Sequence, residues 1–327
     1  MQSATYRRKI VFTVFKVVLI GLISWVLYNQ IWNRDNLSNI LTEISLGVED
    51  RGYYLLIATI MLMPVNWVLE SYKWKSIVSQ FQKFSLGQAI RSVLSGVTMA
   101  IWTPARIGEY GGRLIGIGVD NRGQALIGNF ISSLSQNIVN LSIGLFATIL
   151  FLNTTDVIGE DSKLLIFISG GVVLSLLTFA YYNLAKLGKV LELLPNWRWI
   201  TIAKDKIKLV DNLEISFLLR LLTLSTFRYA IYLTQYVLLI LFFSVTQDIY
   251  VATIGVATVF FIQSNLPLPP VLSVLARGEL AILLWSVFTD NTVGILASTF
   301  TLWIINLGIP AIIGLIHISR YQVEPKS

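Results

Sequence analysis

Long apolar runs dominate this chain and restrict what it can fold into. Six of them are long enough to cross a bilayer as an α-helix, which takes about 20 residues. They are residues 10–32, 53–72, 121–152, 163–185, 220–245 and 291–317. Only 13% of the residues are charged, about half the usual share in soluble domains. The sequence therefore predicts an all-α integral membrane protein with one transmembrane domain over residues 1–327.

Two further apolar stretches, residues 87–118 and 249–288, are interrupted in the middle. The first contains the segment TPARIGEYGGR at 103–113, with three charges, three glycines and a proline. The second contains Pro267, Pro269 and Pro270, which leave less than a full span on either side. Charges and irregular backbone are tolerated in a bilayer only against protein or a water-filled cavity. We therefore expect each stretch to form a re-entrant hairpin of two half-helices.

Loop charges support this topology. Basic and acidic loops alternate along the chain: the basic ones are 73–91, 186–220 and the two tails, and the acidic ones are 33–52 and 153–163. The positive-inside rule places the basic loops in the cytoplasm. Every loop falls on the side that its charge predicts only if the first hairpin returns to the cytoplasmic side and the second to the outside. We expect a multi-pass protein of the cytoplasmic membrane with both termini in the cytoplasm.

These assignments imply an inverted repeat. Its first half covers residues 10–152 and its second half residues 163–317, and the two hairpins are oppositely oriented. Inverted halves with a broken element at matching positions indicate a transporter with its site near the membrane midplane. Half-helix N-termini at the breaks would attract an anion there.

The first hairpin carries most of the candidate site residues. Arg106, Glu109 and Arg113 are spaced three and four apart, so on a helix after the break at Pro104 they share one face. Two arginines around one glutamate leave a net positive charge, which suits a phosphate. Gly108 allows a headgroup to approach the backbone closely. The alternative is an ion pair that only stabilises the hairpin.

Other candidates lie outside that hairpin. Arg277 is two helical turns beyond the prolines of the second hairpin, and Glu279 lies close to it in sequence. Arg228 falls inside an apolar span, where an arginine needs an anionic partner or water. Asn129 and Gln136 belong to a polar stripe on one helix face, which either lines the site or links helices.

Catalytic and cofactor motifs are missing from the sequence. There is no cysteine and only one histidine, His317, and we find no nucleophile elbow, nucleotide-binding loop or metal-ligand cluster. We expect no enzyme activity, no cofactor and no metal. The net charge of +7 follows from basic cytoplasmic loops and does not require a nucleic-acid partner.

Three motifs together resemble a known family. They are Trp67-x-x-Glu70-x-x-Lys73-Trp74, Pro104-x-Arg106-x-Gly108-Glu109, and the proline-rich break followed by Arg277-Gly278. Over nearly the whole chain they are similar to the flippase-like transmembrane domain found N-terminal to lysylphosphatidylglycerol synthases and as stand-alone proteins. The resemblance implies movement of a lipid, such as aminoacylated phosphatidylglycerol, between leaflets, or a role in polyisoprenyl-phosphate-linked glycan pathways.

The resemblance also implies roles for individual residues. Arg106 and Glu109 would be substrate-site residues, with Arg277 as their counterpart in the second hairpin. Ser273 stands where the family often has an acidic residue, which weakens the case for an ion pair there. The aminoacyl-transfer domain is absent from the sequence, so we expect no synthesis of lysyl-lipid.

The expected function is translocation of an anionic or polyisoprenyl-phosphate-type lipid, with Arg106 and Arg277 binding one phosphate from opposite sides of the midplane. The partner would be a membrane lipid with a phosphate headgroup. Two alternatives remain open. One is a non-transporting scaffold for a lipid synthase or glycosyltransferase, and the other is an ion-coupled carrier of a small anion.

Overall fold

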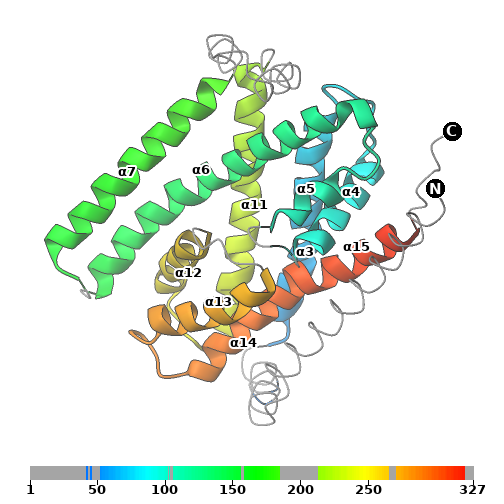
Figure 1. Ribbon diagram of the computed structural model, residues 1–327. Coiled ribbons are helices and arrows are strands. Elements are labelled where there is room, and N and C mark those ends of the chain that lie inside the picture. The colour runs from blue at the N-terminus through cyan, green and yellow to red at the C-terminus, as the bar shows by residue number, and fades with distance from the viewer. Residues whose placement is uncertain are drawn as a thin grey trace, which may run out of the picture.

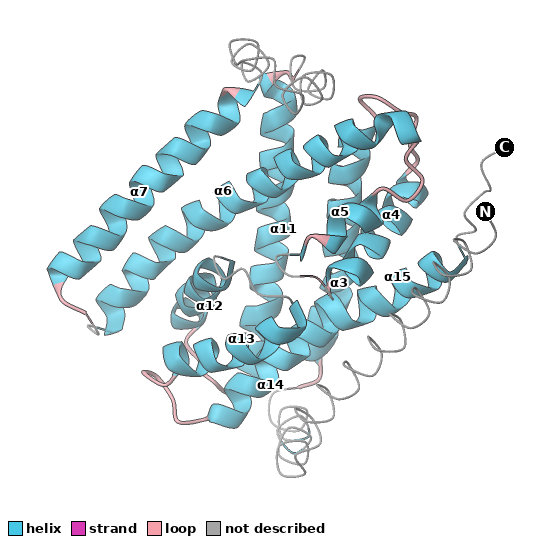
Figure 2. Cartoon of the chain, in the orientation of Figure 1, coloured by secondary structure: helices cyan, strands magenta, loops and turns pink. Residues whose placement is uncertain are grey.

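The computed structural model describes residues 52–101, 103, 106–155, 158–184, 213–264 and 270–320, together with Thr42 and Ser45. Its regular elements in these ranges are all helical (Figure 2). They are α3 (Tyr54–Val78), α4 (Leu86–Ala100), α5 (Gly108–Arg113), the 3-10 turn η2 (Val119–Asn121), α6 (Arg122–Thr155), α7 (Glu160–Tyr182), α11 (Ile215–Phe242), α12 (Ile249–Ser264), α13 (Pro270–Trp285), α14 (Thr292–Trp303), the π-helical segment η4 (Ile304–Gly308) and α15 (Ile309–Arg320).

Five helical segments are long and apolar enough to cross a membrane. They are Tyr54–Val78, Val119–Thr155, Glu160–Tyr182, Ile215–Phe242 and Thr292–Ser319. Five of the six spans expected from hydropathy are thereby confirmed as helices, and the sixth, residues 10–32, lies outside the described residues. The chain is consistent with a multi-pass membrane protein. The membrane that it occupies and the side of its termini stay predictions.

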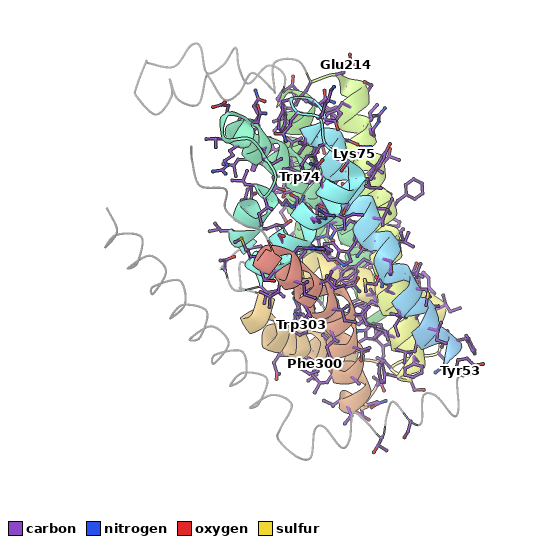
Figure 3. All side chains as sticks on the ribbon, turned by 90° about the vertical axis from the view of Figure 1, so that its right-hand side faces the viewer. Tyr53, Trp74, Lys75, Glu214, Phe300 and Trp303 are labelled. Atoms are coloured by element: carbon purple, nitrogen blue, oxygen red, sulfur yellow. The ribbon has the colours of Figure 1, made fainter. Side chains whose placement is uncertain are left out.

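The direction of each helix follows from where its ends lie (Figure 1). Figure 3 places Tyr53, just before α3, and Glu214, just before α11, at opposite ends of the molecule. These two helices pack against each other and so run in opposite directions. Gln82, which follows α3, bonds to the backbone of Gly116 and Gly118 just before α6. The whole α4–α5 segment therefore leaves and returns at one end of the bundle.

The second interrupted stretch is closed in the same manner. Asn291, the N-cap of α14, donates from its amide to the carbonyl of Phe243, the C-cap of α11, at 3.1 Å. The α12–α13 segment thus also returns to the end from which it starts. Each of these two helices has 16 residues, about 24 Å of helix, which is less than the ~30 Å hydrocarbon core. Their insertion as re-entrant hairpins, and the repeat itself, stay predictions.

The first interrupted stretch differs from the expected pair of half-helices. α4 has 15 residues, but α5 has only 6. After α5 the chain turns at Gly116, whose φ of +82° is accessible to glycine at little steric cost. The second arm is therefore one short helix and a loop, because glycines near residue 112 favour close backbone contact over a long helix.

Close contact between α4 and α5 positions the charged residues of the latter. A Cβ atom on Gly112 would lie 2.5 Å from the Cα of Gly96, so the two backbones touch. The Ser92 hydroxyl donates to the Arg113 carbonyl at 2.6 Å, and the Trp74 indole donates to Ser92 at 2.9 Å. This chain of bonds ties α5 through α4 to α3.

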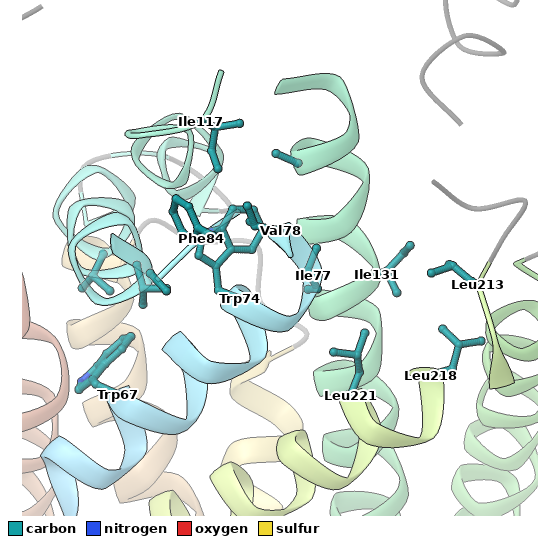
Figure 4. Close-up of a cluster of buried hydrophobic side chains, with 14 of the residues drawn as sticks. Trp67, Trp74, Ile77, Val78, Phe84, Ile117, Ile131, Leu213, Leu218 and Leu221 are labelled. Atoms are coloured by element: carbon teal, nitrogen blue, oxygen red, sulfur yellow. The ribbon is translucent and has the colours of Figure 1, made fainter. Parts of the chain in front are cut away.

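Apolar packing forms two clusters. One surrounds Trp74, Phe84 and Ile117 where α3, α4 and α6 meet (Figure 4). The other surrounds Phe242 and Trp285 where α11, α12 and α13 meet. By contrast, α7 buries only Lys163 and Tyr181, as expected of a helix that faces lipid on most sides.

Candidate functional site

Glu70 is the centre of a buried charge cluster. Its carboxylate lies 2.5 Å from Arg113, 3.3 Å from Lys73 and 3.4 Å from Arg228. These partners come from α5, from the same turn of α3 and from α11. The Glu70 and Arg113 side chains are each only 4% exposed. One carboxylate therefore joins three helices in a region that excludes water.

Glu109 forms a second, more accessible centre beside the first. Its two oxygens lie 2.5 Å from Arg113 and 3.0 Å from Arg106. Exposure rises outward along this chain of charges, from 4% at Arg113 to 15% at Glu109 and 38% at Arg106. Arg106 is thus the outer member of the cluster.

Two tryptophans of α3 support the arginines. Trp67, Glu70 and Trp74 are spaced three and four apart, which puts them on one helix face. The Arg228 guanidinium lies 5.5 Å from the centre of the Trp67 ring, and that of Arg113 lies 5.4 Å from the centre of the Trp74 ring. A cation over an aromatic face is attracted by the ring quadrupole. This face of α3 therefore orients both guanidinium groups.

Polar groups of α6 and α11 contact the charge cluster. Gln136 accepts a long bond from Arg228 at 3.4 Å, and the Lys73 ammonium donates to the Ser225 hydroxyl at 3.2 Å. Asn129 is 2% exposed, and neither of its amide atoms meets a hydrogen-bond partner among the described residues. A buried unsatisfied amide is costly, but no described contact joins Asn129 to the charge cluster.

The cluster has an excess of positive charge. Four cationic side chains surround two carboxylates, which leaves two positive charges uncompensated. Buried guanidinium nitrogens remain without a described acceptor: Nε of Arg106 and Arg228, and both Nε and Nη1 of Arg113. Arginine binds phosphate and carboxylate through such paired N–H groups. The arrangement can therefore bind an anion in addition to Glu70 and Glu109.

The backbone of Arg106 adopts an unusual conformation. Its φ is +59°, a region that non-glycine residues enter at a cost and that is enriched at functional sites. Arg106 lies in the break between α4 and α5, before the helix that carries Glu109 and Arg113. The three charges gather as their spacing predicts, although Arg106 itself is not on the helix.

The second interrupted stretch contributes Arg277 from α13. Its charge interacts with that of Arg106 and with Tyr232 and Tyr236 of α11, and its buried Nε has no described hydrogen-bond partner. Among described residues it forms no ion pair. The two interrupted stretches therefore present arginines to one region.

Tyrosines of α11 pack against Phe260 of α12, and two of them, Tyr232 and Tyr236, interact with Arg277. The Tyr232 ring stacks on Phe260 of α12 with centroids 4.9 Å apart, and Tyr229 meets the edge of the same ring at 6.0 Å. The buried Tyr229 hydroxyl has no partner among the described residues. Aromatic faces with a free hydroxyl are suited to a ligand that is partly polar.

The structure brings together most of the candidate residues expected from sequence. Arg106, Glu109, Arg113 and Arg228 are in one network, with Gln136 at its edge. Gly108 donates from its backbone to the Thr103 hydroxyl at 2.7 Å, which closes the turn before α5. Glu279 is exposed and does not join the network. Pro104 lies outside the described residues.

Two members of the network were not among the expected site residues. Glu70 and Lys73 stood out only as part of a motif, and Glu70 proves to be the hub. Glu70 is identifiable as a carboxylate within the expected span 53–72, where ionisable groups are expensive and usually functional. Lys73 was expected in the basic loop 73–91, and that assignment is wrong, because α3 continues to Val78 and buries Lys73 at 1% exposure.

Comparison with known proteins gives no match: neither protein-family models, nor curated proteins, nor solved structures are significantly similar to this chain. The resemblance to the flippase-like domain family stays a prediction.

Proposed function

We propose that this protein binds the headgroup of an anionic lipid and moves it across the membrane. The observation that carries the proposal is the buried cluster around Glu70 and Glu109, with its two uncompensated positive charges and unpartnered guanidinium nitrogens. An isolated charge in low dielectric is unfavourable unless a counter-ion joins it. A phosphate headgroup supplies that counter-ion, while its acyl or isoprenyl tails stay in the lipid.

The broken segments support transport rather than a purely structural role. Both interrupted stretches return to the end of the bundle where they begin, and both contribute arginines that interact, Arg106 and Arg277. Broken helices that meet near the midplane from opposite sides are the usual construction of a carrier site. The polyisoprenyl-phosphate and phosphatidylglycerol lipids suggested by the sequence resemblance both fit this chemistry.

Glu109 is the carboxylate beside which a phosphate would bind. It holds Arg106 and Arg113 at 3.0 and 2.5 Å and is more exposed than Glu70. A phosphate oxygen can accept from the guanidinium N–H groups of these arginines that have no described acceptor. Glu109 would then keep both arginines in place for the ligand.

The test is translocation of a headgroup-labelled anionic lipid in vesicles that contain the purified protein. Arg106→Gln and Glu109→Gln are expected to slow translocation at least tenfold, because the first removes a phosphate-binding group and the second the carboxylate that positions it. Arg220→Gln is the matched control, since Arg220 is an exposed cation on the helix that carries Arg228. Thermal stability is measured on the same preparations, because a structural ion pair would instead lose stability when Glu109 is neutralised.

Two outcomes would favour other functions. Normal translocation by all three variants, or no translocation by the unmodified protein, would support a scaffold that assists a lipid synthase or glycosyltransferase. Uptake of a small anion into vesicles free of labelled lipid would identify a soluble-anion carrier.

A further inference from the structure

We infer that this site selects a phosphate group with at least two negative charges, namely a phosphomonoester or a diphosphate, over a phosphodiester with one. The inference rests on the proposed lipid-binding function and concerns the same site. It follows from how many positive charges lie in the site, how few carboxylates balance them, and which N–H groups lack acceptors.

The count of positive charges exceeds what one phosphodiester neutralises. The Glu70–Glu109 cluster has two more cations than carboxylates. Arg277 of α13 carries a further positive charge and forms no ion pair with a described residue. A phosphodiester would leave two of these charges uncompensated, whereas a diphosphate or an ionised monoester leaves one or none.

No other described carboxylate supplies the missing balance. Every acidic side chain in the described part of the chain other than Glu70 and Glu109 is exposed. Glu279, the acidic residue nearest to Arg277 in sequence, is one of these exposed side chains. Arg106 is paired with Glu109, and Arg277 forms an ion pair with no described carboxylate. A doubly charged ligand would supply the counter-ion that the described residues do not.

Hydrogen-bond capacity leads to the same class of ligand. Five buried guanidinium nitrogens have no acceptor among the described residues: Nε of Arg106, Arg228 and Arg277, and Nε and Nη1 of Arg113. A phosphodiester offers two terminal oxygens, a phosphomonoester three and a diphosphate more. Charge-assisted bonds to these oxygens are the strong ones in proteins. A headgroup with more terminal oxygens satisfies more of the site.

The experiment measures binding of matched lipids to the full chain in mild detergent. Phosphatidic acid and phosphatidylglycerol with identical acyl chains differ in the glycerol that turns the phosphomonoester of the first into the phosphodiester of the second. Farnesyl diphosphate tests an isoprenoid tail, and inorganic pyrophosphate tests whether a tail is needed. Tryptophan fluorescence is a direct readout, because the rings of Trp67 and Trp74 lie against Arg228 and Arg113.

Phosphatidic acid and farnesyl diphosphate are expected to bind at least about tenfold more tightly than phosphatidylglycerol, as one or more additional charge-assisted bonds require. Arg277→Gln should reduce that preference to near unity while binding of phosphatidylglycerol changes little. Arg277→Lys keeps the charge and should retain part of the preference, and Arg220→Gln should retain all of it. Thermal unfolding confirms that each variant is folded.

Equal affinity for phosphatidic acid and phosphatidylglycerol in the unmodified protein would overturn the charge inference and leave the lipid-binding function standing. An unchanged preference in a folded Arg277→Gln variant would also overturn it. Binding of pyrophosphate as tight as that of farnesyl diphosphate would keep the charge inference but overturn the lipid function. If none of the probes binds, both are overturned.

Discussion

The two interrupted stretches differ in how their charged residues are paired, although each returns to the end of the bundle from which it starts. In the α4–α5 stretch, Glu109 and Arg113 are bound to each other, to Arg106 and to Glu70. In the α12–α13 stretch, Arg277 has no ion pair with a described residue, and the tyrosines beside it are packed chiefly through their rings. One stretch satisfies most of its own charges and the other leaves a charge for something else.

This difference in charge pairing indicates that the two stretches have different roles in the site. A network that includes a buried hub gives rigid geometry, because several groups must move for any one to move. Arg277, whose described partner is the Tyr232 hydroxyl rather than a carboxylate, is free to bind an anionic ligand. We therefore interpret the α4–α5 stretch as the fixed half of the site and Arg277 with its tyrosines as the half that the ligand completes.

The largest difference in stability is expected between a buried acid, Glu70, which is bound to the α4–α5 stretch, and an exposed acid, Glu279, in the α12–α13 stretch. Glu70→Gln removes the hub and leaves Arg113, Lys73 and Arg228 without their common partner, so the free energy of unfolding should fall by about 3–5 kcal/mol. Glu279→Gln changes an exposed side chain and should shift it by less than about 0.5 kcal/mol. Unfolding in detergent measures both. Similar small effects from the two would contradict the view that the first network is structural as well as functional.

Backbone packing gives a second comparison. A Cβ atom on Gly112 would lie 2.5 Å from the Cα of Gly96, whereas one on Gly111 would meet only the Met99 sulfur at 3.8 Å. Gly112→Ala should therefore destabilise the protein by about 1–3 kcal/mol, and Gly111→Ala should have little effect. In the second stretch, Gly255→Ala would meet the Trp285 ring at 2.5 Å.

The contact at Gly255 involves a side chain, which can shift more readily than a backbone. Gly255→Ala should thus cost less than Gly112→Ala in the same unfolding assay. A larger loss at Gly255 would mean that the second stretch is the more rigid one, contrary to our interpretation.

Much of the helical framework could be predicted from sequence. Apolar runs predict the spans because a bilayer demands about 20 apolar residues of helix. Prolines predict the end of α12 because they remove backbone donors. The spacing of Arg106, Glu109 and Arg113 predicts that their charges meet, since the relevant contacts are local in sequence.

Contacts between distant residues could not be predicted. Glu70 meets Arg113 across 43 positions and Gln136 meets Arg228 across 92, and nothing local in sequence pairs them. The contact of Gly112 with Gly96 likewise exists only once α4 packs against α5. Sequence therefore showed where charges enter the membrane but not which carboxylate would hold them.

A smaller effect is expected from coupling between the two arginines. Arg106→Gln and Arg277→Gln should each weaken binding of the preferred lipid by about 1.5–3 kcal/mol, because each loses a charge-assisted bond. If both contact one headgroup, the loss in the double variant should fall short of the sum by about 0.5–3 kcal/mol. Arg106→Lys should also weaken binding, since lysine keeps the charge but not the paired N–H geometry. Strict additivity would place the two arginines in separate sites.

The smallest effect concerns two tyrosine hydroxyls of α11, one with a described partner and one without. The buried Tyr236 hydroxyl bonds to the Thr299 hydroxyl at 2.7 Å, so Tyr236→Phe should lower the free energy of unfolding by about 1 kcal/mol. The Tyr229 hydroxyl has no described partner, so Tyr229→Phe should leave that free energy within about 0.5 kcal/mol of the original. If the ligand supplies the partner, the same Tyr229→Phe variant should bind lipid several-fold less tightly. A loss of stability at Tyr229 equal to that at Tyr236, with lipid affinity unchanged, would show that the hydroxyl serves the protein alone. The second half would then resemble the first in satisfying its own polar groups.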